Sequence, residues 1–271
     1  MTIDIIKPTS LINHSGLIKP DWPAAKNIHA FCSTRIPLAD IAQNASTEPP
    51  SLQFQGAYDS FNLALHVEDD AQTVNANRQH LARQLKLPGE PLWLNQVHGH
   101  RVVNATQFSN TLPDADASFS DQPNQICTVM TADCLPVLMC NLKGSKVAAA
   151  HAGWRGLADG VIENTVASLG ESPHRLLVWL GPAIGPQAFE VGEEVRDVFV
   201  KQQPAAVAAF QQNRSGHFLA DIYKLARLRL KAMGVEAVYG GDYCTFTDAQ
   251  HFYSYRRDGK TGRQASLIWF E

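Results

Sequence analysis

Short apolar runs bounded by turn residues dominate the middle and the end of the chain. Runs of this length between glycine, proline and asparagine are typical of buried β-strands. They predict strands at 126–131, 135–140, 146–151, 176–180 and 266–270. The polar, glycine-containing stretch 141–145 separates the second run from the third, so we expect these two strands to be joined as a hairpin.

Helical periodicity appears at three places, where apolar residues recur every three or four positions. One segment runs from Asp159 to Gly170, a second covers 193–201, and a third runs from Asp221 to Gly234. An aspartate before a helix can accept hydrogen bonds from its first free N–H groups, and a glycine often ends a helix. The strands and helices do not alternate strictly. We therefore expect an α+β fold, a single domain of layered mixed β-sheets flanked by helices.

The length and composition fit one large globular domain. The chain has 271 residues, of which 45% are hydrophobic and 18% charged, and this excludes a disordered or fibrous protein. We expect one domain over 1–271, with the polar, proline-containing stretch 37–56 as an inserted loop.

Charge and targeting signals narrow the class of protein further. The formal net charge is −3, so we expect neither nucleic acid nor a membrane surface as a partner. The N-terminal residues do not form a secretory signal, and no apolar stretch is long enough to span a bilayer. We therefore expect a cytoplasmic protein whose five cysteines are free, as core residues, metal ligands or nucleophiles.

Three polar stretches at the ends of apolar runs carry the candidate chemistry. They place His98, Cys134 and His151 where rigid strands can bring side chains together at a cleft. Two imidazoles and a thiolate suit Zn²⁺ or copper, and three protein ligands leave a position open for water or substrate. Their spacing matches no standard zinc pattern, and a Cys134–His151 dyad with a thiol nucleophile fits the same residues. From the residues alone, both kinds of site remain open.

Longer motifs surround these three residues and continue to the end of the chain. They read N-Q-V-H-G, D-A-D, T-A-D-C-L-P-V-L, A-A-A-H-A-G-W-R-G, G-P-A-I-G-P-x-x-F-E-V-G, D-Y-C-T-F and F-Y-S-Y-R-R-D-G-x-T-G-R-Q. Together they resemble the bacterial laccase-domain family, whose members have been called polyphenol oxidases, purine nucleoside phosphorylases and peptidoglycan editing factors. The resemblance is interrupted after Arg35, where a longer insertion replaces the family's Gly-Gly-Val-Ser stretch.

The resemblance implies a fold, a metal site and an activity. The fold would be the cysteine-hydrolase-like α+β domain of that family. His98, Cys134 and His151 would bind Zn²⁺, with copper as the other metal proposed. The implied reactions are phosphorolysis of adenosine, inosine and methylthioadenosine, and deamination of adenosine. The partners would be a purine nucleoside and phosphate, and the chain could form a homodimer.

Catalytic roles beyond metal binding are predicted from side-chain chemistry. Phosphate favours guanidinium donors, so Arg155 is the first candidate to bind it, with Arg35 and Arg78 as weaker candidates. Asp133 is a candidate general base, or a carboxylate that orients a ligand histidine. The predicted catalytic residues are Cys134, His151, Asp133 and Arg155.

Two amides complete the predicted substrate-binding residues. Gln96 would point to the same side as His98 if that segment were a strand, and it could then hydrogen-bond a purine edge. Asn62 lies where the family pattern resumes after the insertion.

Two other activities remain open. A copper-dependent polyphenol oxidase, or laccase, needs several coppers that are commonly held by H-x-H pairs. The ten histidines of this chain include one such pair, His98 and His100. A cysteine amidohydrolase that edits peptidoglycan precursors would use Cys134 as nucleophile and His151 as base. Metal dependence separates this last hypothesis from the other two.

Overall fold

The computed structural model describes residues 16–37, 56–108 and 112–271, and these form the α+β fold with mixed sheets that the sequence predicts. Nearly all of the predicted loop at 37–56 lies outside the described residues. None of the described helices is both long and apolar enough to cross a membrane.

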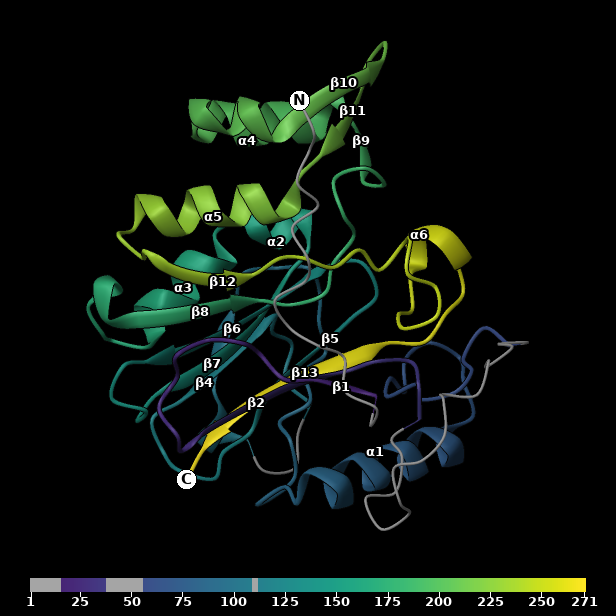
Figure 1. Cartoon of the computed structure of the whole chain (residues 1–271), viewed down its shortest axis with the longest axis vertical. Coiled ribbons are helices and arrows are strands. Elements are labelled where there is room, and N and C mark those ends of the chain that lie inside the picture. Colours follow the sequence, from purple (N-terminus) through teal and green to yellow (C-terminus); the bar gives the residue numbers. More distant parts are fainter. Residues whose placement is uncertain (1–15, 38–55, 109–111) are drawn as a thin grey trace.

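Two larger sheets form the centre of the molecule (Figure 1). The first sheet is antiparallel, in the order β1 (Leu17–Ile18), β2 (Ile28–Ser33), β13 (Gln264–Phe270) and β5 (Cys127–Thr131). The second is mixed, in the order β12 (Ala237–Gly240), β8 (Leu176–Leu180), β6 (Leu135–Asn141), β7 (Val147–Ala152), β4 (Ala117–Ser120) and β3 (Val102–Asn104). A small antiparallel sheet follows the order β10 (Phe210–Arg214), β11 (His217–Ala220) and β9 (Glu190–Gly192).

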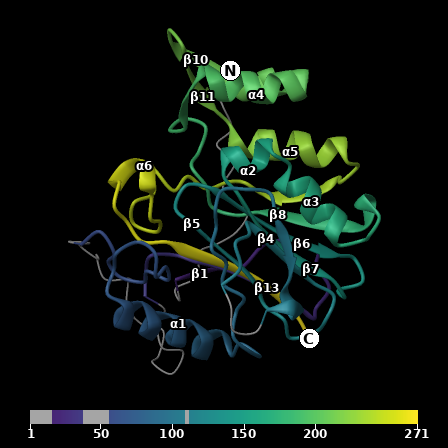
Figure 2. The same cartoon turned by 180° about the vertical axis from the view of Figure 1, so that it is seen from behind.

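The longer helices cover the outer faces of these sheets, and the short helix α6 lies beside them. The helices are α1 (Ala71–Leu85), α2 (Trp154–Ala158), α3 (Val161–Ser168), α4 (Glu193–Gln202), α5 (Ile222–Ala232) and α6 (Tyr255–Asp258). Short 3₁₀ turns lie at Ala105–Gln107, Pro173–Arg175 and Pro204–Ala209. In both Figure 1 and Figure 2, α1 lies on one side of the two larger sheets and α2 to α5 lie on the other.

Three apolar clusters correspond to the three interfaces between these layers. Cys127, Val129, Leu138 and Cys140 belong to the cluster between the two larger sheets. The opposite face of the six-stranded sheet packs against α2, α3 and α5, and the opposite face of the four-stranded sheet packs against α1. Because both larger sheets are covered on both faces, β5, β6 and β7 are buried along their whole length.

The five predicted strands are confirmed with shifts of one or two residues at their ends, and β6 and β7 form the predicted hairpin. Helices also form at the three predicted places. Asp221 caps α5, because its carboxylate accepts a hydrogen bond from Lys224 N at 2.9 Å. The predicted cap at Asp159 is wrong: the preceding helix α2 ends there, and Gly160 begins α3 with a left-handed backbone of φ 94°.

Candidate metal centre and its cavity

The two larger sheets bring the three predicted ligands together. Cys134 lies in the tight turn between β5 and β6, and His151 is the penultimate residue of β7. Since Leu135 pairs with Ala152 in the β6–β7 ladder, the two strand ends place Cys134 beside His151. His98 comes from a loop, and the ligand atoms of the three side chains all lie within 4.8 Å of one another. The described residues contain no other group of three such ligands.

The segment around His98 is a loop rather than the strand that the sequence analysis considered. His98 has a left-handed backbone, with φ 59°, which residues other than glycine rarely adopt. The buried carboxylate of Asp116 stabilises this loop, because it accepts hydrogen bonds from the backbone N–H groups of Val97 (3.2 Å), His98 (3.0 Å) and Gly99 (2.6 Å). One carboxylate therefore fixes the position of the first ligand.

The same carboxylate orients the third ligand. Asp116 Oδ1 lies 2.8 Å from His151 Nδ1 and accepts a hydrogen bond from it, so Nε2 of the neutral imidazole keeps a lone pair for a metal. Asp133 is the residue that the sequence suggests for this role, but the carboxylate that contacts His151 is that of Asp116. Asp116 is the second aspartate of the D-A-D motif, and the motif alone does not indicate this role.

The three side chains favour ionisation of the thiol. Burial alone would raise the pKa of Cys134, but the charges and hydrogen bonds of His151 and His98 lower it to about 6. Burial likewise opposes protonation of His151, yet Cys134 and Asp116 raise its pKa to about 9. The pKa of Asp116 is held below its usual range, because hydrogen bonds from His151 and the backbone outweigh its burial. In the absence of a metal, the site therefore holds a thiolate beside an imidazolium at neutral pH.

A metal ion fits this donor set. Thiolate and imidazole are the ligands that zinc and copper prefer, and the carboxylate behind His151 is the partner that metal-ligating histidines usually have. Gly153 keeps the space between the ligands free, because a Cβ atom there would lie 2.9 Å from His98 Nδ1 and 3.0 Å from Cys134 Sγ. The chemistry of the residues thus suits one metal ion with three protein ligands.

A cavity of about 490 Å³ opens beside the three ligands, and both apolar and cationic side chains line it. The apolar side chains include Trp154, Ile184, Phe189 and Ile222. The cationic side chains are those of Arg155, Arg256 and Arg263, and His66 lines the cavity as well. Sequence reasoning did not propose Arg256, Arg263 or His66, although both arginines lie in the last of the family motifs.

Besides the three metal ligands, three more of the predicted residues line the cavity, but two of these also have structural partners. Both polar atoms of the Gln96 amide have a backbone partner, because Nε2 donates to Met130 O (2.8 Å) and Oε1 accepts from Met130 N (2.7 Å). Asp133 accepts from the Thr245 hydroxyl (2.7 Å) and from the backbone N–H of Arg256 (2.6 Å). Arg155 is exposed, with its guanidinium over the Trp154 ring at 4.5 Å.

The other three predicted substrate-binding residues are not among the residues that line the cavity. Arg35 is buried and donates to the carbonyl groups of Asp59 and Ala249. Arg78 donates to Leu63 O and lies 3.8 Å from the centre of the Trp93 ring. Asn62 is fully buried, with both ends of its amide hydrogen-bonded. Their contacts favour structural roles.

Comparison with known proteins identifies the family. Residues 52–271 match the family described as multi-copper polyphenol oxidoreductase laccase. The chain belongs to this family. The laccase-domain resemblance that the motifs suggested is thereby confirmed.

Relatives within the laccase family cover nearly the whole chain. The Escherichia coli K12 protein named purine nucleoside phosphorylase YfiH is 50% identical over 255 residues, which are 94% of this chain and 99% of that protein. A Pseudomonas aeruginosa purine nucleoside phosphorylase is 51% identical over 255 residues, 94% and 98% of the two chains. The crystal structure of the Neisseria meningitidis protein NMB0706 is 48% identical, with a TM-score of 0.85 and coverage of 94% and 99%.

Proposed function

We propose that this protein is a zinc-dependent purine nucleoside phosphorylase that also deaminates adenosine. The observation that carries the proposal is the convergence of His98, Cys134 and His151 at a cavity lined by both apolar and cationic side chains. The names of two relatives at about half identity, both purine nucleoside phosphorylases, support the same reaction.

The cavity suits the two substrates of phosphorolysis. Its volume of about 490 Å³ lies within the range of small-molecule sites, and aromatic and aliphatic side chains such as Trp154 and Phe189 suit a purine ring. The guanidinium groups of Arg155, Arg256 and Arg263 suit a phosphate dianion. In the reaction, a phosphate oxygen bonds to C1′ of the ribose while the bond from C1′ to N9 breaks, and the electron pair leaves with the purine. The products are ribose 1-phosphate and the free base.

A zinc ion held by His98, Cys134 and His151 would supply a Lewis acid next to the substrates. The chain's own residues then have separate tasks. Asp116 keeps the proton on Nδ1 of His151, and the apolar side chains exclude water from the purine. Deamination of adenosine would use the same purine position, with water adding to C6 and ammonia leaving.

Phosphorolysis is tested with the purified protein, whose zinc content is measured first. With inosine and phosphate, we expect release of hypoxanthine and ribose 1-phosphate; with adenosine, we expect ammonia as well as adenine. Methylthioadenosine should likewise release its base. The Cys134→Ser variant should lose both zinc and activity. Absence of base release from zinc-replete protein would contradict the proposal.

A cysteine hydrolase is the second candidate, because Cys134, His151 and Asp116 are arranged as nucleophile, base and orienting carboxylate. It would hydrolyse an amide, such as that of a peptidoglycan precursor. Chelation distinguishes the two candidates. Activity that survives removal of the metal but not treatment with iodoacetamide favours the hydrolase, whereas loss with the metal and recovery with zinc favours the phosphorylase.

The description of the family as multi-copper suggests a third test. The described residues offer one cluster of three ligands, which suits a single ion. A copper titration should therefore reach about one tightly bound ion per chain. A higher stoichiometry together with oxidation of a phenol would favour the polyphenol oxidase.

A further inference from the structure

The cavity beside the metal centre is unusually rich in positive charge for a chain with a net charge of −3. It is lined by three guanidinium groups, and Asp133 is the one carboxylate that lines it among the described residues. Both oxygens of Asp133 already accept hydrogen bonds from Thr245 and Arg256. Such an excess of cationic groups in a cleft attracts an anionic ligand.

Only one of the three arginines has a free pair of donors in a half-buried position. Arg256 is exposed, and its Nη1 donates to Glu190 O at 2.7 Å, which ties α6 to β9. Arg155 is also exposed and lies over Trp154.

Arg263 is half-buried, and its Nη1 donates to Thr261 O (2.7 Å) and Gly262 O (3.0 Å). Its Nε and Nη2 have no hydrogen-bond acceptor among the described residues. These two nitrogens form the fork that binds two phosphate oxygens.

The strand register places Arg263 close to the metal centre. In the β13–β5 ladder, Gln264 pairs with Thr131, the last residue of β5. Arg263 precedes Gln264 and Cys134 follows Thr131 by three residues, so both lie at the same end of the antiparallel pair. Burial lowers the pKa of Arg263, and the nearby charges of Cys134 and Asp133 partly oppose this shift. Burial also lowers the pKa of His66, and the positive charges of Arg263 and Arg78 lower it further.

The backbone that carries Arg263 is held rigidly from both sides. Asn62 Oδ1 accepts from Arg263 N at 2.9 Å, and Thr261 donates to Ala57 O at 3.2 Å. A Cβ atom at Gly262 would lie 2.8 Å from the ring of Tyr253, so the chain passes close against that ring. Asn62, predicted as a substrate-binding residue, here positions the backbone of Arg263.

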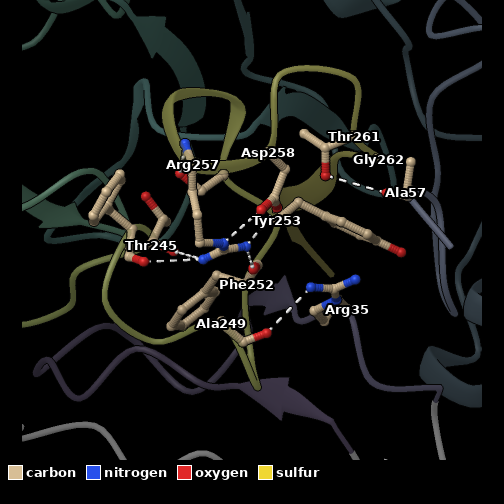
Figure 3. A network of polar contacts seen from close by, with 12 residues as sticks. Arg35, Ala57, Thr245, Ala249, Phe252, Tyr253, Arg257, Asp258, Thr261 and Gly262 are labelled. Atoms are coloured by element: carbon tan, nitrogen blue, oxygen red, sulfur yellow. Dashed lines mark hydrogen bonds and ion pairs between the residues drawn. The ribbon is translucent and has the colours of Figure 1, made fainter. Parts of the chain in front are cut away.

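Figure 3 shows how the preceding loop is anchored. Arg257 points into its own loop, where it donates to Thr245 O (2.8 Å) and Phe252 O (2.9 Å) and pairs with Asp258 (2.7 Å). Each of the two neighbouring arginines of α6 thus has a structural contact, Arg256 through Nη1 with Glu190 O and Arg257 with this network. A rigid loop loses little freedom when its anion binds.

We propose that Arg263 is the phosphate-binding residue of this protein, holding two oxygens of the phosphate through Nε and Nη2. This proposal rests on the proposed phosphorolysis. It replaces Arg155, the first candidate from the sequence, with a residue that is half-buried and preorganised. His66 adds a polar group beside the same position.

Kinetics with separate variation of the two substrates tests this role. For Arg263→Gln we expect the KM for phosphate to rise at least about tenfold, with a small change in the KM for inosine and no change in zinc content. Arg263→Lys keeps the charge but loses the fork, so it should recover only part of the phosphate affinity. The control is Arg83→Gln, which removes an exposed arginine of α1 and should leave both KM values unchanged.

Calorimetry at constant ionic strength measures the binding of inorganic phosphate alone, and it tests this proposal independently of the enzymatic activity. Saturable binding to the wild type that is lost in Arg263→Gln supports the phosphate site even if no nucleoside is cleaved, and then the proposed function fails alone. An unchanged phosphate KM and unchanged phosphate binding in Arg263→Gln overturn the proposal. The proposal is also overturned if only Arg155→Gln changes the KM for phosphate and phosphate binding, or if Arg263→Gln loses zinc.

Discussion

Asp116 is the residue on which the geometry of the candidate metal centre depends most. Its carboxylate binds the His98 loop through three backbone N–H groups and His151 through Nδ1. A neutral amide in its place cannot accept all four hydrogen bonds. Carboxylates that hydrogen-bond a metal-ligating histidine commonly contribute one to two orders of magnitude in metal affinity.

The Asp116→Asn variant should therefore bind zinc about 10- to 100-fold more weakly. Competition with a chromophoric chelator measures this affinity. Asp114→Asn is the matched control, because Asp114 belongs to the same motif but is exposed and bonded to Asn95. Equal zinc affinities for the two variants would show that Asp116 does not position the ligands.

The pKa values of the site predict an unusual reactivity for one cysteine in zinc-free protein. The pKa of Cys134 is about 6, against an ordinary 9.0, so the thiolate forms as the pH rises through about 6. Burial raises the pKa values of Cys32, Cys127 and Cys140 to about 12, so these thiols stay protonated.

Alkylation by iodoacetamide should consequently reach half of its maximal rate near pH 6 in zinc-free protein, and mass spectrometry should locate it at Cys134. Added zinc should slow the reaction, and the Cys134→Ser variant should lack this phase. A midpoint near pH 9 would mean that His151 and His98 do not stabilise the thiolate.

At the scale of elements, the turn from β7 into α2 explains the H-A-G-W-R-G motif. The candidate ligand His151 is the penultimate residue of β7, and Gly153 leaves room for the other two candidate ligands. A Cβ at Gly156 would lie 2.5 Å from Gly99 O, so this second glycine lets α2 approach the loop that carries His98. The two glycines thus permit a strand end, a helix and a loop to meet at one point.

We expect Gly153→Ala to displace His98 or Cys134 and to remove most of the bound zinc, while the fold is retained. Elemental analysis of the purified variant measures this loss, and its circular dichroism spectrum checks the fold. At Gly89 a Cβ meets nothing closer than 3.9 Å, so Gly89→Ala should retain zinc. Full zinc occupancy in Gly153→Ala would contradict the geometry of this turn.

Across the whole molecule, the apolar side chains are packed between the stacked layers of sheets and helices. Leu138 lies in the cluster between the two larger sheets and is fully buried. Leu142, a few residues later on the same hairpin, is 51% exposed. These two leucines therefore allow the packing contribution to be measured within one element.

Leu138→Ala should lower the free energy of unfolding by roughly 2–5 kcal/mol, because it leaves a cavity between two sheets. Leu142→Ala should change it by less than about 0.5 kcal/mol. Urea denaturation of zinc-free protein gives both values. Similar costs for the two variants would contradict the layered packing.

Patterns along the chain predicted five of the strands, three of the helices and the family. Apolar runs located β5 to β8 and β13 because strand burial on both faces leaves a local signature in the chain. The motifs indicated the family, and they singled out His98, Cys134 and His151 as one possible site. Apolar runs and short motifs are local in the chain, so strands and family membership can be predicted from them without the tertiary structure.

The contacts that bring these residues together are visible only in the tertiary structure. Asp116 joins His98 to His151 through hydrogen bonds between a loop and two strands, and the register of β13 with β5 brings Arg263 to the same cavity. Arg35, Arg78 and Asn62 carry polar groups as suitable as those of Arg263, but packing turns them toward backbone partners. The identity of a side chain sets what it can bind, whereas long-range pairing of strands sets what it meets.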